Sequence, residues 1–346
     1  MNIYGLCESA GASDVHPDIG QYFVAPVSFA FPFSRKEAAP LPYGIPAEFR
    51  GMAAIDRDFG RCRFSAVYDF FNYFPRESNA FLAAARYAVI GATGLGDVDF
   101  FNGVLAEVKE WGEARPGAKL ALEVFHLWLR QWLRTPGFDA WQQLRQIEAE
   151  SLPALWRPMI GYSIMMMLLL ARERVAAYSM AVSTLLMSEQ QSGWLQDKVW
   201  LKVACALACR EIDRREDEAA WFSRAIDEAA ESGYALPFLG ISMGPGSIFG
   251  KLLSERAPEL FGKIRLHSAR FHRNRVKLHN AYTGGNVSEL LSPREFYMVR
   301  LVVEGLSYKA IAKRLNISLG RAKNIAMRVY EKLGVHSKKA LPGLVW

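Results

Sequence analysis

The spacing of apolar residues limits the fold of this chain more than any other feature. From Asn79 to Ser254 apolar residues recur every three or four positions, most regularly in 119–134 and 196–215, and the alternation typical of strands is nearly absent. This spacing places the apolar side chains on one face of an α-helix. The sequence therefore predicts an all-α fold. Apolar residues make up 51% of the chain, which is enough for a packed core and excludes global disorder.

A loose internal repeat indicates how these helices are arranged. Two segments match at an offset of 44 residues, and they pair Ala176, Tyr178, Ser179, Ala181 and Val182 with Ala220, Phe222, Ser223, Ala225 and Ile226. The same step from an aromatic to an apolar residue occurs at Phe101/Val104 and at Trp141/Leu144. Stacked hairpins of this length are typical of a tetratricopeptide-like helical-repeat domain, which we expect over residues 61–262. The alternative is an ordinary helical domain whose amphipathic helices imitate a repeat.

The two ends of the chain differ from this central region. Residues 1–60 are rich in proline, glycine and aromatic residues and lack a helical period, so they predict an irregular arm or cap. Residues 263–346 carry 17 Lys and Arg against 4 Glu and no Asp, whereas residues 1–262 carry 25 basic and 31 acidic residues. A basic tail on an acidic body indicates a polyanionic partner for the tail, with nucleic acid the leading candidate. We expect 263–289 to be a basic connecting segment and linker.

Residues 290–346 have the clearest local signals for helix boundaries. Ser292, Ser307 and Ser318 each precede a helical pattern and are good N-cap residues. The helices expected after them are 293–304, 308–315 and 319–333. Gly305 and Gly334 are suited to end the first and third of these helices, because glycine readily adopts the left-handed conformation. The spacing predicts a helix-turn-helix with its turn at Asn316 and Ile317.

The third of these helices has two distinct faces. Its buried face is expected to carry Ala322, Ala326, Val329 and Leu333. Its opposite face presents Gly320, Asn324, Met327, Arg328 and Glu331, with Arg321 and Lys323 on the flanks. A helix of this kind, basic and polar over its N-terminal half, has the geometry that enters a DNA major groove.

Several short motifs make the comparison with a known family specific. They are Leu291-Ser-Pro-Arg-Glu295, Glu304-Gly-Leu-Ser307, Lys309-Ala-Ile-Ala312, Arg314-Leu315, Ile317-Ser318, Lys323-Asn324 and Tyr330-Glu-Lys-Leu-Gly-Val335. In this order and without a gap, they resemble the LuxR/GerE-type DNA-binding domain. The resemblance implies a four-helix domain over 290–346 that binds double-stranded DNA. The sequence departs from the family pattern at Tyr297, Arg321, Ala322 and Ile325, and Pro342 interrupts the segment where the last helix is expected.

The resemblance also implies roles for individual residues. Lys323, Asn324 and Met327 occupy its base-reading positions, which suits lysine as a donor to guanine and asparagine as a partner of adenine. The expected phosphate contacts are Ser307, Lys309, Ser318, Arg321 and Arg328, where the two serines act through the N-terminal N–H groups of the helices that they cap.

A helical-repeat region directly before such a domain is similar to the C-terminal half of MalT-like regulators. That similarity implies a small-molecule or protein effector at residues 61–262, although the preceding ATPase module has no counterpart here. One DNA-binding module buries little surface, so we expect a homodimer on two half-sites. The sequence predicts a DNA-binding transcription regulator. The alternative is a helical-repeat interaction scaffold whose helix-turn-helix no longer reads DNA.

Motifs for catalysis or metal binding are weak. Gly240-Ile-Ser-Met-Gly244 fits the G-x-S-x-G pattern, but no Asp lies beyond Asp227 and the preceding segment is helical in pattern. His267, His272 and His279 are spaced so that a helix cannot bring them to one ion. We therefore expect no enzymatic activity, no metal and no cofactor.

Features of secreted or membrane proteins are also weak. The uncharged runs 158–171 and 175–188 have 14 residues each, short of the about 20 that span a bilayer. The N-terminus lacks the basic region of a signal peptide. The four cysteines are too few for a disulfide scaffold, and we expect Cys205 and Cys209 in the core. These features predict a cytoplasmic protein without membrane contact.

Overall fold

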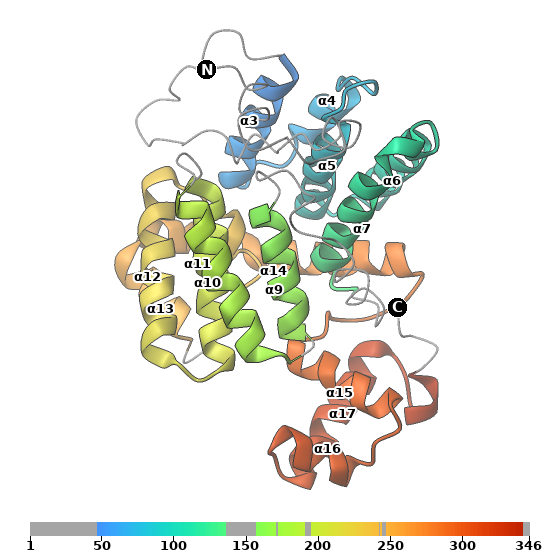
Figure 1. The fold of residues 1–346 in the computed structure, drawn as a ribbon, viewed down its shortest axis with the longest axis vertical. Helices are drawn as coiled ribbons and strands as arrows, with labels where there is room; N and C mark the ends of the chain where they lie inside the picture. The colour runs from blue at the N-terminus through green and yellow to red at the C-terminus, as the bar shows by residue number, and fades with distance from the viewer. Residues whose placement is uncertain are drawn as a thin grey trace.

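The computed structural model describes residues 47–135, 157–170, 172–190, 195–241, 243 and 247–341. The regular structure over these residues is helical without a strand, which confirms the predicted all-α fold. Figure 1 shows a large helical part, α3 to α14, and a small part, α15 to α17, at one end of the molecule. We call these parts the body and the helix-turn-helix domain. Within the described residues no helix is long and apolar enough to cross a membrane.

The first half of the body is built around α5. Its helices are α3 (Ala47–Gly60), α4 (Val67–Asn72), α5 (Phe81–Leu95), α6 (Val98–Glu113) and α7 (Lys119–Leu133), with the 3-10 turn η2 (Pro116–Ala118) before α7. α5 is buried over almost its whole length because α3, α4, α6 and α7 pack around it. Glycine makes the close approach possible, since a Cβ atom at Gly91 or Gly94 would come within 2.6 Å of Val67 or 2.1 Å of Phe64.

Helix α3 corrects one prediction. Residues 1–60 were expected to be irregular, but Ala47–Gly60 form a helix, while residues 1–46 lie outside the described residues. Met52, Ile55 and Phe59 recur every three or four positions and are buried. This helical pattern is short and follows a stretch rich in proline, so it is hard to separate from its surroundings in the sequence.

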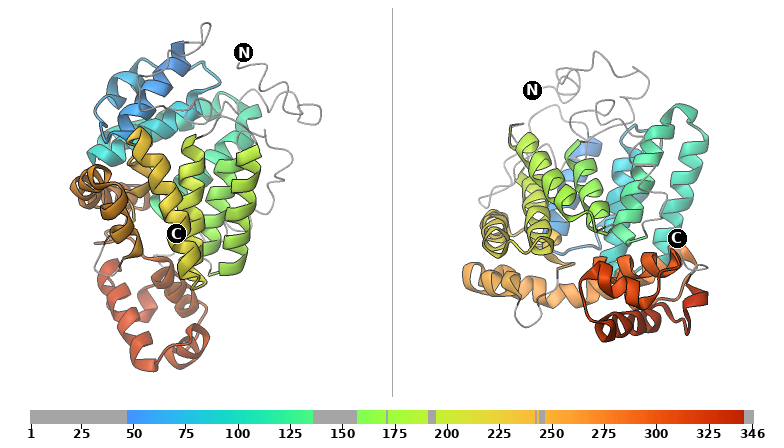
Figure 2. Two further views of the ribbon diagram at one scale, coloured as in Figure 1. Left: turned by 90° about the vertical axis from the view of Figure 1, so that its left-hand side faces the viewer. Right: turned by 60° about the horizontal axis from the view of Figure 1, so that its bottom comes forward.

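The second half of the body is a row of four helices. They are α9 (Arg157–Leu170), α10 (Arg174–Gln190), α11 (Leu195–Glu211) and α12 (Arg215–Ser232). Each helix packs on the next, and the left view of Figure 2 shows the row from its side. The matched segments at 176–182 and 220–226 fall on α10 and α12, the second helices of two successive hairpins. Trp141 and Leu144 lie outside the described residues, and the tetratricopeptide-like character of the row stays a prediction.

The loop after this row bears on two sequence predictions. Gly240 follows a 3-10 turn, η5 (Leu236–Phe238), where a nucleophile elbow would need a strand, and Ser242 lies outside the described residues. Cys205 and Cys209 are fully buried in α11, which confirms their predicted place in the core.

Helix α14 connects the body to the helix-turn-helix domain. It runs from Pro258 to Thr283 after the short helix α13 (Ile248–Arg256), and it packs against α5, α6, α7 and α13. Residues 263–283, expected as part of a basic connecting segment, form the C-terminal part of this helix, which packs on the body as well as leading to the helix-turn-helix domain. The high net charge conceals an amphipathic helix, in which Arg265, Arg270, Arg273 and Lys277 are exposed while Ile264, Phe271 and Leu278 are buried.

The helix-turn-helix domain forms as the local signals indicate. Its helices are α15 (Pro293–Val303), α16 (Tyr308–Leu315) and α17 (Leu319–Leu333), followed by the 3-10 turn η6 (Lys338–Ala340). Asn316 ends α16 in the left-handed conformation, with φ of 51°. Of the fourth helix expected in this domain, the described residues contain only η6, and residues 342–346 lie outside them.

The body and the helix-turn-helix domain share an apolar core at their junction. We call residues 284–292, between α14 and α15, the linker. Leu127 of α7, Met167 of α9 and Val276 of α14 belong to the same cluster as Leu290 and Leu291 of the linker. Helix α15 packs directly against α9. The right view of Figure 2 shows the helix-turn-helix domain against this end of the body. Since the contact is apolar and buried, it gives the helix-turn-helix domain a defined orientation on the body.

Candidate nucleic-acid interface

The inner face of α17 fixes this helix in its domain. The predicted buried residues Ala322, Ala326, Val329 and Leu333 are all buried, and Ile325 joins them. Ala322 and Ile325 are two of the departures from the LuxR/GerE pattern, and both point into the core rather than toward a ligand. These two departures therefore leave the outer surface of α17 unchanged.

The outer face of α17 is open to solvent. Lys323, Asn324 and Met327 are exposed, and Met327 is 59% exposed although it is apolar. Arg321 and Arg328 are exposed on the same helix. An exposed helix face with cationic and amide side chains can donate hydrogen bonds to phosphates and to base edges in a major groove. The described part of the body leaves these side chains uncovered.

The two serines of the predicted phosphate contacts cap their helices. Ser307 Oγ accepts a hydrogen bond from Ala310 N at 3.2 Å, and Ser318 Oγ accepts one from Arg321 N at 3.2 Å. Capping leaves other N–H groups of the first turns directed out of the helix ends, where an anion is favoured. Lys309 is exposed in the first turn of α16.

A pair of tyrosines holds α16 in place on α17. The hydroxyl oxygens of Tyr308 and Tyr330 lie 2.5 Å apart, within hydrogen-bond distance. Burial raises the pKa of Tyr330, and the hydrogen bond with Tyr308 raises it further. Tyr330 therefore stays neutral near neutral pH, and its hydrogen bond with Tyr308 fixes the relative positions of the two helices.

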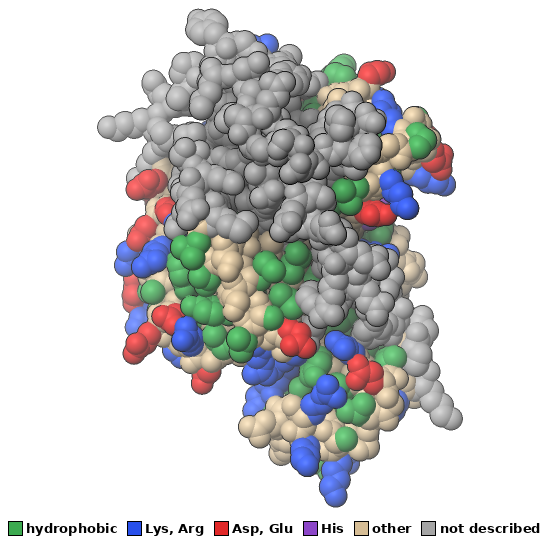
Figure 3. Space-filling view, in the orientation of Figure 1, with side chains coloured by type: hydrophobic (Ala, Val, Ile, Leu, Met, Phe, Trp, Pro, Cys, Tyr) green, Lys and Arg blue, Asp and Glu red, His purple; other side chains and the backbone are tan. Residues whose placement is uncertain are grey.

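A group of arginines lies where α15 meets the outer face of α17 and the body. Burial lowers the pKa of Arg294, and the positive charges of Arg321, Arg174 and Arg328 lower it further, while Glu211 opposes them. Figure 3 shows Lys and Arg side chains gathered where the helix-turn-helix domain meets the body. Crowded positive charges repel one another, so a phosphate group placed among them would relieve this repulsion.

Sequence reasoning missed two members of this group. Arg294 belongs to the Ser292-Pro-Arg-Glu295 motif, which was interpreted as a helix start and not as part of a basic surface. Arg174 is the first residue of α10 in the body, and Glu211, close by, is paired with Arg172 at 2.5 Å. Only the packing of the helix-turn-helix domain on the body brings Arg174 to this surface, so no local signal could have found it.

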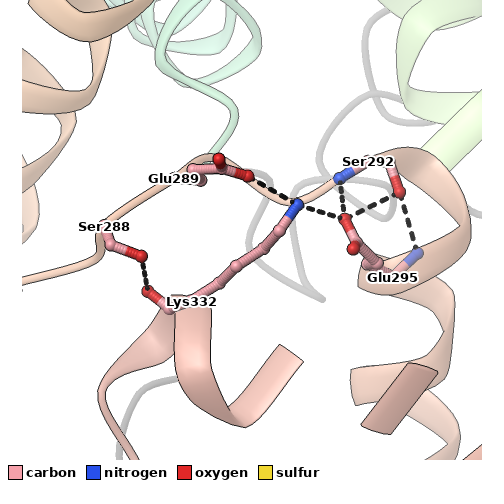
Figure 4. A network of polar contacts seen from close by, with 5 residues as sticks. All are labelled: Ser288, Glu289, Ser292, Glu295 and Lys332. Atoms are coloured by element: carbon pink, nitrogen blue, oxygen red, sulfur yellow. Dashed lines mark hydrogen bonds and ion pairs between the residues drawn. The ribbon is translucent and has the colours of Figure 1, made fainter. Parts of the chain in front are cut away.

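Lys332 anchors the C-terminal end of α17 to the linker and to α15. Its ammonium lies 3.0 Å from a carboxylate oxygen of Glu289 and 3.0 Å from one of Glu295, as Figure 4 shows. Glu295 also closes the capping box with Ser292, whose backbone N–H donates to it at 2.9 Å. Its burial would raise the pKa of Glu295, but the bonds from Ser292 and Lys332 outweigh burial and hold this pKa below its usual value.

The comparisons with known proteins agree with this geometry. The family model described as GerE, bacterial regulatory proteins, luxR family, matches residues 289–342. This is the part of the chain that carries the capped helices and the exposed face of α17. No curated protein and no solved structure matches the chain. The match supports a DNA-binding transcription regulator of the LuxR type, and this is a family of regulators rather than enzymes.

Proposed function

We propose that this chain is a sequence-specific transcription regulator whose body senses an effector or a partner and controls the helix-turn-helix domain. The exposed outer face of α17, in a domain that matches the luxR family, is the observation that supports this proposal best. In the proposed complex with DNA, Lys323 and Asn324 donate hydrogen bonds to base edges, and Met327 makes an apolar contact in the major groove.

The phosphate contacts orient the domain on the duplex. Lys309, Arg321 and Arg328 neutralise phosphates, and the first-turn N–H groups after Ser307 and Ser318 add neutral contacts. Arg294 and Arg174 extend this basic surface from α17 across α15 to the body. Contacts from both parts of the protein make the affinity depend on how the body and the helix-turn-helix domain are docked.

Control by the body follows from the shared apolar core. Because Met167 and Leu127 pack against the linker and α15, an effector that shifts α7, α9 or α14 changes the docking of the helix-turn-helix domain. A homodimer would place two copies of α17 on half-sites about one helical turn apart, which raises specificity beyond that of one module.

Capture of fragmented genomic DNA by the full-length protein tests this function. We expect enrichment of a two-part motif. The double variant Lys323→Ala with Asn324→Ala is expected to lower affinity for this motif about thirtyfold or more, since each of the two lost base contacts contributes about 1–3 kcal/mol. The matched control is Lys109→Ala with Asn102→Ala, which removes the same side chains from the exposed face of α6. Equal affinity of the two double variants, or no enrichment by the wild type, would support the interaction-scaffold alternative.

Salt dependence separates phosphate contacts from base contacts. Each neutralised phosphate contributes a slope of about −0.9 to the dependence of log affinity on log salt. Arg328→Gln is therefore expected to reduce the magnitude of the slope by about 0.9 and to weaken all sequences alike. An unchanged slope in Arg328→Gln would remove Arg328 from the phosphate contacts.

A further inference from the structure

Two arginines meet inside the body, where α7 ends against α14. His279 Nδ1 of α14 lies 2.9 Å from the carbonyl oxygen of Leu133, the last residue of α7. The next residue, Arg134, ends α7 in the left-handed conformation, with φ of 54°. Arg275 lies one turn before His279 on the same face of α14 and is only 8% exposed. The fold thus brings Arg134 and Arg275 to one place.

The guanidinium of Arg275 lacks an acceptor among the described residues. Its Nε and Nη2 atoms are buried without a hydrogen-bond partner, and neither Arg275 nor Arg134 forms an ion pair within the described part of the chain. A buried charge without a partner is costly, because the protein interior replaces none of the hydration that the charge loses.

Other buried ionic side chains of the body show the usual arrangement. Lys202 is paired with Glu228, and the largely buried Arg172 is paired with Glu211. Glu218, which is fully buried, is paired with Arg210 at 2.7 Å. In this body a buried charge therefore generally has a partner of opposite sign, and Arg275 departs from this rule.

The charges around Arg275 make its lack of a negatively charged partner more costly. Burial, together with the positive charge of Arg134, lowers the pKa of Arg275 to about 9. Among the described residues, the phenol of Tyr162 in α9 acts electrostatically on both arginines. Burial raises the pKa of Tyr162 to about 12, so this phenol is neutral and can donate a hydrogen bond.

The guanidinium of Arg275 lies just beneath the surface. A Cβ atom on Gly240 would come within 3.4 Å of Nη2 and 3.5 Å of Nη1, and Gly240 is itself exposed. These nitrogen atoms therefore lie directly beneath the exposed backbone of Gly240.

We propose that Arg275 and Arg134, together with the hydroxyl of Tyr162, form a binding site for the oxyanion group of a small effector. A guanidinium offers N–H donors in a planar fork that matches the two oxygens of a carboxylate or of a phosphate. A bound oxyanion supplies the missing negative charge and accepts hydrogen bonds from Nε and Nη2, while Tyr162 donates a further one.

The site is placed to affect the helix-turn-helix domain. Val276, the neighbour of Arg275, belongs to the junction core with Leu290 and Leu291. One turn further along α14, the side-chain amide of Asn280 holds the backbone of Val287 in the linker. Its Oδ1 accepts from Val287 N–H at 2.8 Å, and its Nδ2 donates to the carbonyl oxygen of Val287 at 3.0 Å. An anion that draws α14 toward the end of α7 therefore shifts the linker. This consequence for DNA rests on the proposed function, whereas binding of the anion does not.

The site is tested by titrating the full-length protein, without DNA, with sodium phosphate and separately with sodium acetate. Thermal unfolding and calorimetry are measured against sodium chloride at equal ionic strength. We expect phosphate or acetate to raise the unfolding midpoint beyond the effect of chloride, and the more effective anion identifies the class of the effector. Equal midpoints in all three salts would overturn the proposal.

Substitutions on α14 assign the effect to the site. Arg275→Met is expected to lower the affinity for the anion about tenfold or more, the usual loss when a charge-assisted contact is removed. It is also expected to unfold at a higher temperature than the wild type in chloride, because it removes an unpaired buried charge. Arg273→Met, on the exposed side of the same helix, is the matched control and is expected to keep anion binding.

Two further variants keep the test decisive if Arg275→Met does not fold. Arg134→Met and Tyr162→Phe are each expected to weaken the binding of the anion, and full binding by both would refute the site. DNA capture by the wild type with and without the anion is measured separately. Failure of the site appears in the titration without DNA, whereas failure of the proposed function appears as absence of DNA enrichment.

Discussion

Lys332 allows a sharp test of how the helix-turn-helix domain is held together. Its ammonium is 3.0 Å from both Glu289 and Glu295, but the side chain of Glu295 is 8% exposed and that of Glu289 is 58% exposed. A hydrogen bond to a charged, buried group contributes about 1.5–3 kcal/mol. An exposed ion pair contributes about 0.2–1 kcal/mol because water and salt screen it. Two bonds of equal length are therefore expected to differ several-fold in free energy.

Two double-mutant cycles that share Lys332→Met measure this difference. The first cycle combines it with Glu295→Gln and is expected to give a coupling of about 2 kcal/mol. The second combines it with Glu289→Gln and is expected to give about 0.5 kcal/mol or less. The readout is amide hydrogen exchange of α17 in the full-length protein, which reports the free energy of opening of this helix.

An exposed pair in the same domain provides the control. Arg300 and Glu304 lie on α15 at 2.9 Å, and both side chains are 39% exposed. Their cycle is expected to give about 0.3–0.5 kcal/mol, the usual value for such a pair on a helix. A coupling of Lys332 to Glu289 as large as its coupling to Glu295 would refute the argument that burial decides the strength of these bonds.

Two further predictions concern pH and the junction of the two parts. Because the folded pKa of Glu295 lies below its unfolded value, the stability it contributes is complete above the unfolded pKa and is lost as the pH falls through the folded pKa. Glu295→Gln should therefore reduce the loss of hydrogen-exchange protection that α17 shows as the pH falls. A loss of protection equal to that of the wild type would contradict this prediction. Met167→Ala should destabilise the docked arrangement by about 2–4 kcal/mol, because it leaves a cavity in the junction core. Faster amide hydrogen exchange in both α9 and α15 would show this loss of stability. Faster exchange confined to α9 would contradict the shared core.

The helix-turn-helix domain was predictable because its signals are local. Ser292, Ser307 and Ser318 each bond to a backbone N–H three residues ahead, so a short stretch of sequence contains both partners. The period of apolar residues in α17 likewise indicated its buried face. The predicted buried face did not include Ile325, because that face was assumed to be narrower than it is. Ile325 nevertheless lies three residues after Ala322, within the helical period.

Features that depend on distant residues were predicted poorly. The basic character of 263–289 indicated a connecting segment, yet one face of α14 also completes the core of the body. Here the net charge was a poor guide, since a helix exposes one face and buries the other. The short α3 was missed for a related reason, because its apolar residues are buried only by packing against α5.

The amino-acid sequence contains the helical period, the caps, the charge asymmetry and the motifs that match the luxR family at 289–342. From these follow the all-α class and the distinction between the buried and the exposed face of α17. The meeting of Arg275 with Arg134, and of Arg174 with Arg294, does not follow from them. Each of these pairs joins elements far apart in the chain, and their proximity depends on how α7, α10, α14 and α15 pack, which no local pattern of residues encodes.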